Sequence, residues 1–172
     1  DLSPDHVSAY ALTVEAGTPL ADDPSRHPDD DDQADKYLLA DSMLSSAGFT
    51  NYEISNWAKP NNECAHNLLY WRQGDYLGFG CAAHSHRSGR RWWNVRTPER
   101  YIDLIQSNDS AEASAEDLDP ERRRIEGLQL SLRTREGVPA DSLSTSDREL
   151  LEPLIVIDGE NLVLSTEGRL LA

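Results

Sequence analysis

Residues 6–14 read HVSAYALTV and residues 51–57 read NYEISNW. The first run is apolar on both faces, which predicts a buried parallel strand over His6–Val14. The second alternates between apolar and polar residues and predicts another strand. Between them, residues at helical spacing and a terminating glycine predict a helix: Tyr37, Ala40, Leu44, Ala47 and Gly48. Strand, helix, strand is the repeating unit of a parallel α/β sheet or barrel, so we predict an α/β fold.

Three further segments are also informative. The acidic run Asp29–Asp32 predicts a solvated loop that feeds a helix N-terminus, where carboxylates favour the helix dipole. Thr97-Pro98-Glu99 predicts the start of a helix through Ile105, with proline at its first position. Ser107–Asp117 is small and polar and predicts a linker.

The last third of the chain has the order helix, helix, hairpin. Asp119-Pro120-Glu121 caps the first helix, and Ser146 with Glu149 predicts a capping box for the second. Ile155–Leu164 predicts a hairpin that turns at Asp158-Gly159. This is the order of a winged helix, so we predict two domains, 1–110 and 111–172. From Pro139 onward there are two basic and seven acidic residues, a net charge of −5, which favours a lid or docking role over DNA binding.

Charge and cysteine content restrict the class of protein. The 172 residues carry a net charge of −15, which disfavours binding to nucleic acid. No apolar run approaches the roughly 20 residues that span a bilayer. Two cysteines suit a reducing compartment such as the cytoplasm, and an iron–sulfur cluster takes about four thiolates. The first residue is Asp1 rather than Met, so we expect the sequence to be part of a longer protein.

Several motifs follow one another along the chain. The central ones are His66-Asn67-x-x-Tyr70-Trp71, Tyr76-Leu77-Gly78-Phe79-Gly80 and Ala83-His84-Ser85, and an earlier one spans His6–Glu15. Together they resemble the HemW family, heme chaperones of the radical-SAM superfamily that are related to oxygen-independent coproporphyrinogen III oxidase. The resemblance implies the C-terminal portion of a radical-SAM barrel with an extension, followed by a small winged-helix-like domain.

The resemblance implies a heme site and two further cofactors. The parent protein would bind heme or porphyrin and deliver heme to recipient proteins, with His66 as iron ligand and Asn67, Tyr70 and Trp71 around the ring. The parent would also bind S-adenosylmethionine and a [4Fe-4S] cluster, whose ligands lie outside this chain. By resemblance, Ala11 contacts the adenine edge of S-adenosylmethionine. From the residues alone, a buried histidine among core aromatic side chains remains an alternative for His66.

An island of positive charge interrupts the acidic chain. Arg87, Arg90 and Arg91 lie beside Trp92 and Trp93. Porphyrins of this pathway carry carboxylates, and arginine pairs with carboxylates in a fork geometry, so these residues are candidates for substrate carboxylates. An ordinary surface hairpin is the alternative.

Two other functions remain open at this point. One is the enzyme activity of oxygen-independent coproporphyrinogen III oxidase, although the true oxidases lack His-Asn-x-x-Tyr-Trp. The other is a zinc-binding interaction module with nitrogen and sulfur ligands from closely spaced residues. Those residues are Cys64, His66, Cys81, His84 and His86.

Two positions depart from the family pattern. Cys81-Ala82-Ala83 follows Gly80, where the family usually has Gly-Ala after a single variable residue. A methyl group at Ala82 restricts the backbone angles available there. Asn61 stands where the family usually has glycine, a change that asparagine tolerates well.

Overall fold

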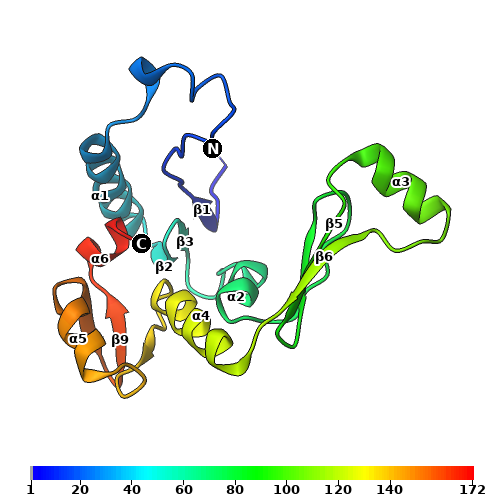
Figure 1. The fold of residues 1–172 in the computed structure, drawn as a ribbon. Coiled ribbons are helices and arrows are strands. Elements are labelled where there is room, and N and C mark those ends of the chain that lie inside the picture. The colour runs from blue at the N-terminus through cyan, green and yellow to red at the C-terminus, as the bar shows by residue number, and fades with distance from the viewer. Residues whose placement is uncertain (1) are drawn as a thin grey trace. The chain divides into compact units, whose positions relative to one another are not determined.

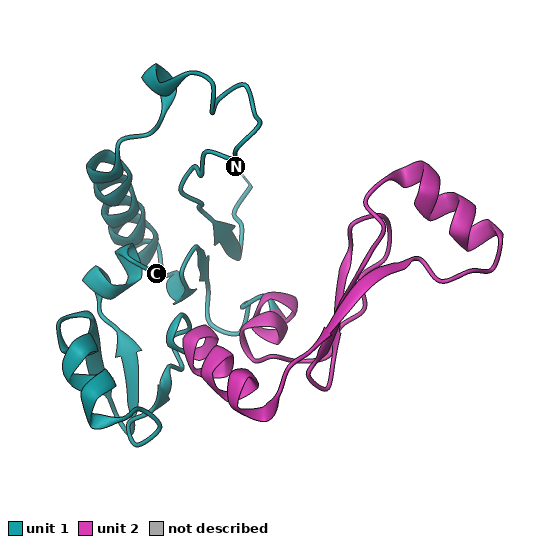
Figure 2. Ribbon diagram, viewed as in Figure 1, with its two compact units in different colours: residues 1–64, 132–172 teal, residues 65–131 magenta. Residues whose placement is uncertain are grey.

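The computed structural model describes residues 2–172 and divides them into two compact units (Figures 1 and 2). Unit 1 comprises the residues up to 64 together with 132–172, and unit 2 comprises 65–131. Each unit contains helices and small antiparallel sheets, which confirms the predicted α/β class. The predicted domain boundary near residue 110 stays a prediction, since these units follow a different division.

The first sheet of unit 1 has the strand order β1-β3-β2. It contains β1 (His6–Ser8), β2 (Thr50–Glu53) and β3 (Asn56–Ala58), and both outer strands pair antiparallel with β3. β1 and β2 therefore run in the same direction, as strand–helix–strand order predicts, but β3 lies between them. The predicted parallel pairing is wrong for these strands, because the chain turns back after β2 and inserts β3.

Two sequence predictions for these strands need correction. Strand β1 ends at Ser8, and Tyr10 and Leu12 are 72% and 55% exposed rather than buried. The run 51–57 is interrupted by a turn rather than forming one strand. The Asn51 side chain donates to the carbonyl of Glu53, and the Glu53 carboxylate accepts from the Ser55 amide, so these buried polar side chains support the turn.

Helix α1 (Asp30–Ser46) confirms the predicted helix and its acidic start. The Asp29 carboxylate accepts a hydrogen bond from the Asp32 amide and caps the N-terminus. Gly48 ends the helix with a φ of +85°, and the Phe49 amide bonds to the Leu44 carbonyl beyond it. Two short 3-10 helices, Pro24–Arg26 and Glu152–Leu154, also belong to unit 1.

The remainder of unit 1 contains a second antiparallel sheet with the order β7-β9-β8. Its strands are β7 (Val138–Pro139), β8 (Ile155–Asp158) and β9 (Asn161–Leu164), and its helices are α5 (Thr145–Leu151) and α6 (Thr166–Leu170). The hairpin β8–β9 turns between Asp158 and Asn161, as predicted. The predicted capping box is wrong: Ser144 caps α5 by accepting from the Asp147 amide.

Unit 2 contains the sheet β4-β5-β6 and three helices. The strands are β4 (His84–Arg87), β5 (Arg90–Asn94) and β6 (Glu112–Asp117). The helices are α2 (Ala65–Trp71), α3 (Pro98–Gln106) and α4 (Pro120–Leu132). The predicted helices starting at Pro98 and Pro120 are confirmed. The predicted linker Ser107–Asp117 is wrong in its second half, because β6 pairs with β5 and places Glu116 opposite Arg91.

Ala82 occupies a backbone conformation that favours glycine. Its φ is +57°, and its amide donates to the Val95 carbonyl at 2.8 Å, which fixes that conformation. A left-handed conformation costs an alanine about 1–2 kcal/mol. Glycine removes this strain, but its greater conformational entropy in the unfolded state offsets part of the gain in stability. We therefore expect Ala82→Gly to stabilise the protein by about 0.5 kcal/mol in urea unfolding.

The neighbouring alanine provides a matched control for this prediction. Ala83 is not among the described residues with positive φ, so Ala83→Gly is expected to destabilise the protein by about 0.5–1 kcal/mol. If both variants lower the unfolding midpoint equally, the strain assigned to Ala82 is absent.

Candidate heme-binding site

Helix α2 presents His66 and Tyr70 to solvent. The two residues are four apart, so they share one face of the helix, as predicted. The Tyr70 hydroxyl and His66 Nε2 are 2.7 Å apart, and the ring centroids are 4.7 Å apart in an edge-to-face arrangement. His66 is exposed, and Tyr70 is 40% exposed. Within the part of the chain that the structure describes, His66 is therefore not a buried core histidine.

The aromatic contacts continue from α2 toward the sheet of unit 2. Tyr70 meets Tyr76 edge-to-face with centroids 4.5 Å apart, and Tyr76 lies 6.2 Å from the His86 ring. We call His66, Tyr70, Tyr76 and His86 the aromatic row. Burial raises the pKa of Tyr76, and the Tyr70 hydroxyl raises it further. The row therefore runs from an exposed imidazole to a buried one.

His86, at the buried end of the row, is fully hydrogen-bonded. Its Nε2 accepts from the Gly89 amide at 3.1 Å, which assigns the proton to Nδ1, and Nδ1 donates to the Gly74 carbonyl at 2.9 Å. His86 is 6% exposed. Both nitrogens are thus engaged, whereas the His66 imidazole is bonded to an exposed tyrosine hydroxyl that a ligand can displace. His66 is the better candidate for an iron ligand.

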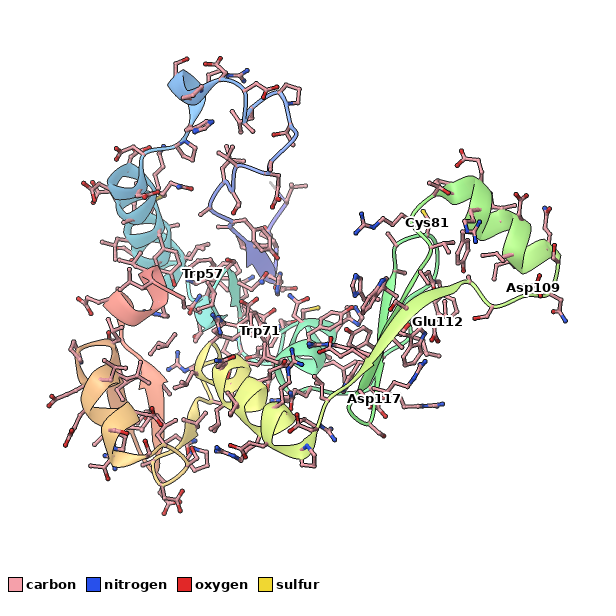
Figure 3. All side chains as sticks on the ribbon, viewed as in Figure 1. Trp57, Trp71, Cys81, Asp109, Glu112 and Asp117 are labelled. Carbon is pink, nitrogen blue, oxygen red and sulfur yellow. The ribbon has the colours of Figure 1, made fainter. Side chains whose placement is uncertain are left out.

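The other two residues of the motif lie on the adjacent stripe of α2. Asn67 and Trp71 are also four apart and are both half-buried (Figure 3 labels Trp71). Asn67 is engaged in an interaction of its own. Their predicted place around a heme ring stays a prediction.

The arginine island differs from the expectation of a free carboxylate-binding cluster. Arg91 donates from Nε and Nη2 to Glu116 and from Nη1 to Glu126 at 3.0–3.1 Å. Arg90 pairs with Glu112 at 2.6 Å and lies over the Trp92 ring. Both guanidinium groups already have carboxylate partners, so we do not include them in the site. Arg87 is exposed and stays a candidate.

The Arg91–Glu116 pair predicts a dependence of stability on pH. The hydrogen bonds from Arg91 hold the pKa of Glu116 below its usual value of 4.5 and raise the pKa of Arg91. Because the pKa of Glu116 is lower in the folded state than in the unfolded state, the pair stabilises the protein fully above the unfolded-state pKa. This contribution is lost as the pH falls toward and through the folded-state pKa. We expect the loss of stability between about pH 5 and 3 to be smaller in Arg91→Gln than in the parent protein, as measured by urea unfolding at each pH.

A matched control for this prediction is Arg100→Gln, which removes one positive charge from unit 2 outside this pair. It is expected to leave the acid sensitivity unchanged. If Arg100→Gln and Arg91→Gln have the same effect, general charge rather than the pair accounts for the pH dependence.

The zinc alternative finds no support among the residues that the structure describes. Within residues 2–172, no three His, Cys, Asp or Glu side chains gather so that they could hold a metal ion. Cys64 and Cys81 are both free thiols, and the exposed His84 stacks on Trp93 with centroids 5.7 Å apart. The predicted residues therefore do not converge on a tetrahedral site.

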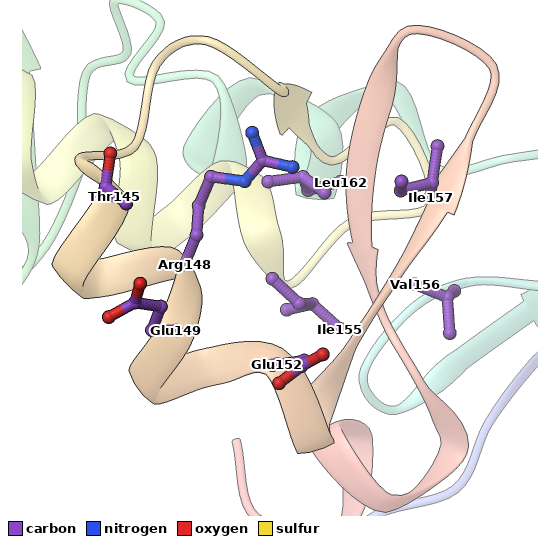
Figure 4. Close-up of a pocket in the computed structure, with 8 residues that line it drawn as sticks. All are labelled: Thr145, Arg148, Glu149, Glu152, Ile155, Val156, Ile157 and Leu162. Atoms are coloured by element: carbon purple, nitrogen blue, oxygen red, sulfur yellow. The ribbon is translucent and has the colours of Figure 1, made fainter.

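Two cavities among the described residues of unit 1 are large enough for a small ligand. One, of about 320 Å³, is lined by Ala11 together with Tyr10, Gln33 and Trp57. The predicted contact of Ala11 with S-adenosylmethionine stays a prediction. The other, of about 450 Å³, lies between α5 and β8, and Arg148 extends across it (Figure 4). Its mixture of one guanidinium, two carboxylates and aliphatic side chains indicates no particular class of ligand.

Comparison with known proteins decides the family. The heme chaperone HemW of Mycobacterium tuberculosis (strain H37Rv) is 43% identical over 98% of this chain and 45% of its own length. The chain belongs to the HemW family. HemW of Bacillus subtilis is 36% identical over 80% of this chain and 37% of its own length. The chain thus spans less than half the length of these HemW proteins and corresponds to their C-terminal portion.

A solved structure agrees with the fold expected of HemW. Coproporphyrinogen III oxidase (HemN) from Escherichia coli, a radical SAM enzyme, matches 99% of this chain and 46% of its own chain with a TM-score of 0.73. At 18% identity this likeness shows the fold alone. No protein-family model matches the chain. No helix within residues 2–172 is long and apolar enough to cross a membrane.

Proposed function

We propose that the full-length protein binds heme at the His66–Tyr70 face of α2 and delivers it to recipient proteins. The observation that carries this proposal is the exposed His66 imidazole, whose Nε2 lies 2.7 Å from an exposed tyrosine hydroxyl. The HemW proteins that are 36–43% identical to this chain are named heme chaperones. Their names support the same cargo here.

The geometry suits a cargo that has to be released. A neutral imidazole nitrogen binds heme iron, and hydrophobic ring surfaces exclude water from the porphyrin. His66 Nε2 would be available to the iron once the Tyr70 side chain moved away, and the rings of Tyr70 and Tyr76 would supply apolar contact. The second histidine of the row, His86, has both nitrogens engaged. Coordination by one exposed histidine favours transfer over permanent retention.

We further propose that the full-length protein binds S-adenosylmethionine and a [4Fe-4S] cluster. The fold similarity to a radical SAM enzyme supports this proposal. The described residues do not fit the cluster, because two separate thiols provide too few ligands. The cluster ligands are therefore proposed to lie outside this chain, and no step of heme binding is derived through them. Two free thiols support a reducing compartment, so we propose a cytoplasmic location.

Heme titration of the full-length protein tests the proposed function. We expect a saturable Soret band and transfer of the heme to an apo-hemoprotein. The oxidase alternative predicts formation of protoporphyrinogen from coproporphyrinogen III with S-adenosylmethionine and a reductant. Turnover of coproporphyrinogen III without saturable heme binding would replace our proposal with the oxidase.

A further inference from the structure

One arginine of unit 2 differs from its neighbours in having no anionic partner. Four arginines on β5 and α4 pair with glutamates at 2.6–3.2 Å: Arg90, Arg91, Arg122 and Arg124. Arg123, on the same helix, is half-buried and has no side-chain hydrogen bond or ion pair among residues 2–172. A partly dehydrated guanidinium without a carboxylate is unfavourable, particularly where carboxylates are abundant. This position is therefore suited to an external anion.

The Arg123 side chain lies beside the turn between β4 and β5. Gly89 has a φ of +89°, and a Cβ atom on it would lie 3.5 Å from Arg123 Cδ and 3.7 Å from Nη1. The Leu118 amide donates to the Gly89 carbonyl at 2.9 Å, which joins the turn to the segment before α4. The distances of 3.5 and 3.7 Å are ordinary van der Waals distances, so the arginine stem packs against this turn, and the positive φ is what favours glycine at position 89.

Arg123 lines a cavity of about 480 Å³ that we call the Arg123 recess. Ser88 and Gln73 contribute polar side chains, and Leu118 and Pro120 contribute apolar surface. Arg124 lines the recess as well, and no acidic residue does. A cationic recess with apolar walls fits a carboxylate that is attached to an apolar body.

Gln73 connects this recess to the helix that carries His66. It follows the end of α2 by two residues, and its Nε2 donates to the Arg123 carbonyl at 3.1 Å. Its Oε1 lies 2.9 Å from the position that a Cβ atom on Gly127 would take, so a glycine in α4 allows this approach. The recess and α2 thus belong to one unit and are joined by direct contacts.

We propose that Arg123 binds a carboxylate of an apolar molecule and that this carboxylate is a propionate of heme. The choice of heme rests on the proposed function, whereas the unpaired guanidinium and the recess are observed independently of it. Arg123 thereby takes the role that the sequence suggested for Arg90 and Arg91, which are paired with glutamates.

Heme and heme dimethyl ester, in which both propionates are uncharged, test this proposal in the full-length protein. We expect the parent protein to bind heme about tenfold more tightly than the ester, since a charge-assisted hydrogen bond contributes about this factor. Arg123→Gln is expected to bind heme only as tightly as the parent protein binds the ester. Its affinity for the ester is expected to equal that of the parent. Arg122→Gln, which removes the same charge from the adjacent position of α4, is expected to retain the tenfold preference.

The outcomes separate this inference from the proposed function. If the parent protein binds neither heme nor the ester, the proposed function and this inference both fail. If it binds both, and Arg123→Gln keeps the preference for heme, the inference alone is overturned. Succinate is the third probe, and its binding is measured by calorimetry. If succinate binds saturably, Arg123→Gln abolishes this binding, and the variant keeps the parent's ratio of heme affinity to ester affinity, the recess binds a free carboxylate and not a heme propionate.

Discussion

His66→Ala is expected to weaken heme binding by at least about tenfold and to shift the Soret band. The substitution removes the imidazole that we propose as iron ligand but leaves the aromatic rings of Tyr70 and Tyr76 in place. Residual binding through apolar contact is therefore expected rather than complete loss. Heme titration with absorbance detection measures both effects. Because His66 is exposed, the fold should be retained, which circular dichroism of the same samples checks.

Two other histidines of unit 2 serve as controls for this experiment. His84 is exposed and stacks on Trp93, so His84→Ala matches the loss of an exposed imidazole and should leave the Soret band unchanged. His86→Ala removes two buried hydrogen bonds and is expected to lower stability by about 1–3 kcal/mol with little direct effect on the ligand field. If His84→Ala alters the spectrum and His66→Ala does not, we have chosen the wrong histidine.

The elements that the sequence predicts correctly are those with local signals. Asp29 and Asp119 directly precede helices α1 and α4, and their carboxylates accept from amides two or three residues later. Such capping contacts lie within one turn of the chain, so neighbouring residues are sufficient to predict them. The face shared by His66 and Tyr70 follows from helical spacing in the same way.

The features that the sequence does not predict depend on partners far along the chain. Strand β6 resembles a linker because its small polar residues are explained only by pairing with β5. Arg91 looks free in the sequence, but its glutamate partners are 25 and 35 residues away. For the same reason, the sequence does not distinguish Arg123 from the arginines beside it, because only the structure shows which of them have glutamate partners. The one sequence signal for the Arg91–Glu116 pair was charge: basic residues lie in the segment that forms β5, and acidic residues lie in the segment that forms β6.

Trp57 is the residue of unit 1 whose removal is expected to destabilise the protein most. It is 0% exposed, its ring lies 5.6 Å from that of Tyr37, and its indole nitrogen donates to Asp41 at 2.7 Å. These contacts join β3 to α1. Truncation leaves a large cavity and removes the indole donor from Asp41, so we expect Trp57→Ala to lower the free energy of unfolding by about 3–5 kcal/mol.

Urea unfolding followed by circular dichroism measures this effect without relying on the tryptophan that is removed. Trp57→Phe retains most of the buried ring and loses the hydrogen bond, so a smaller loss of about 1–2 kcal/mol is expected. Leu150→Ala, at a residue that is 77% exposed, is the control for removing apolar surface and should change stability by less than about 0.5 kcal/mol. A Trp57→Ala midpoint equal to that of Leu150→Ala would mean that Trp57 does not form the core that joins β3 to α1.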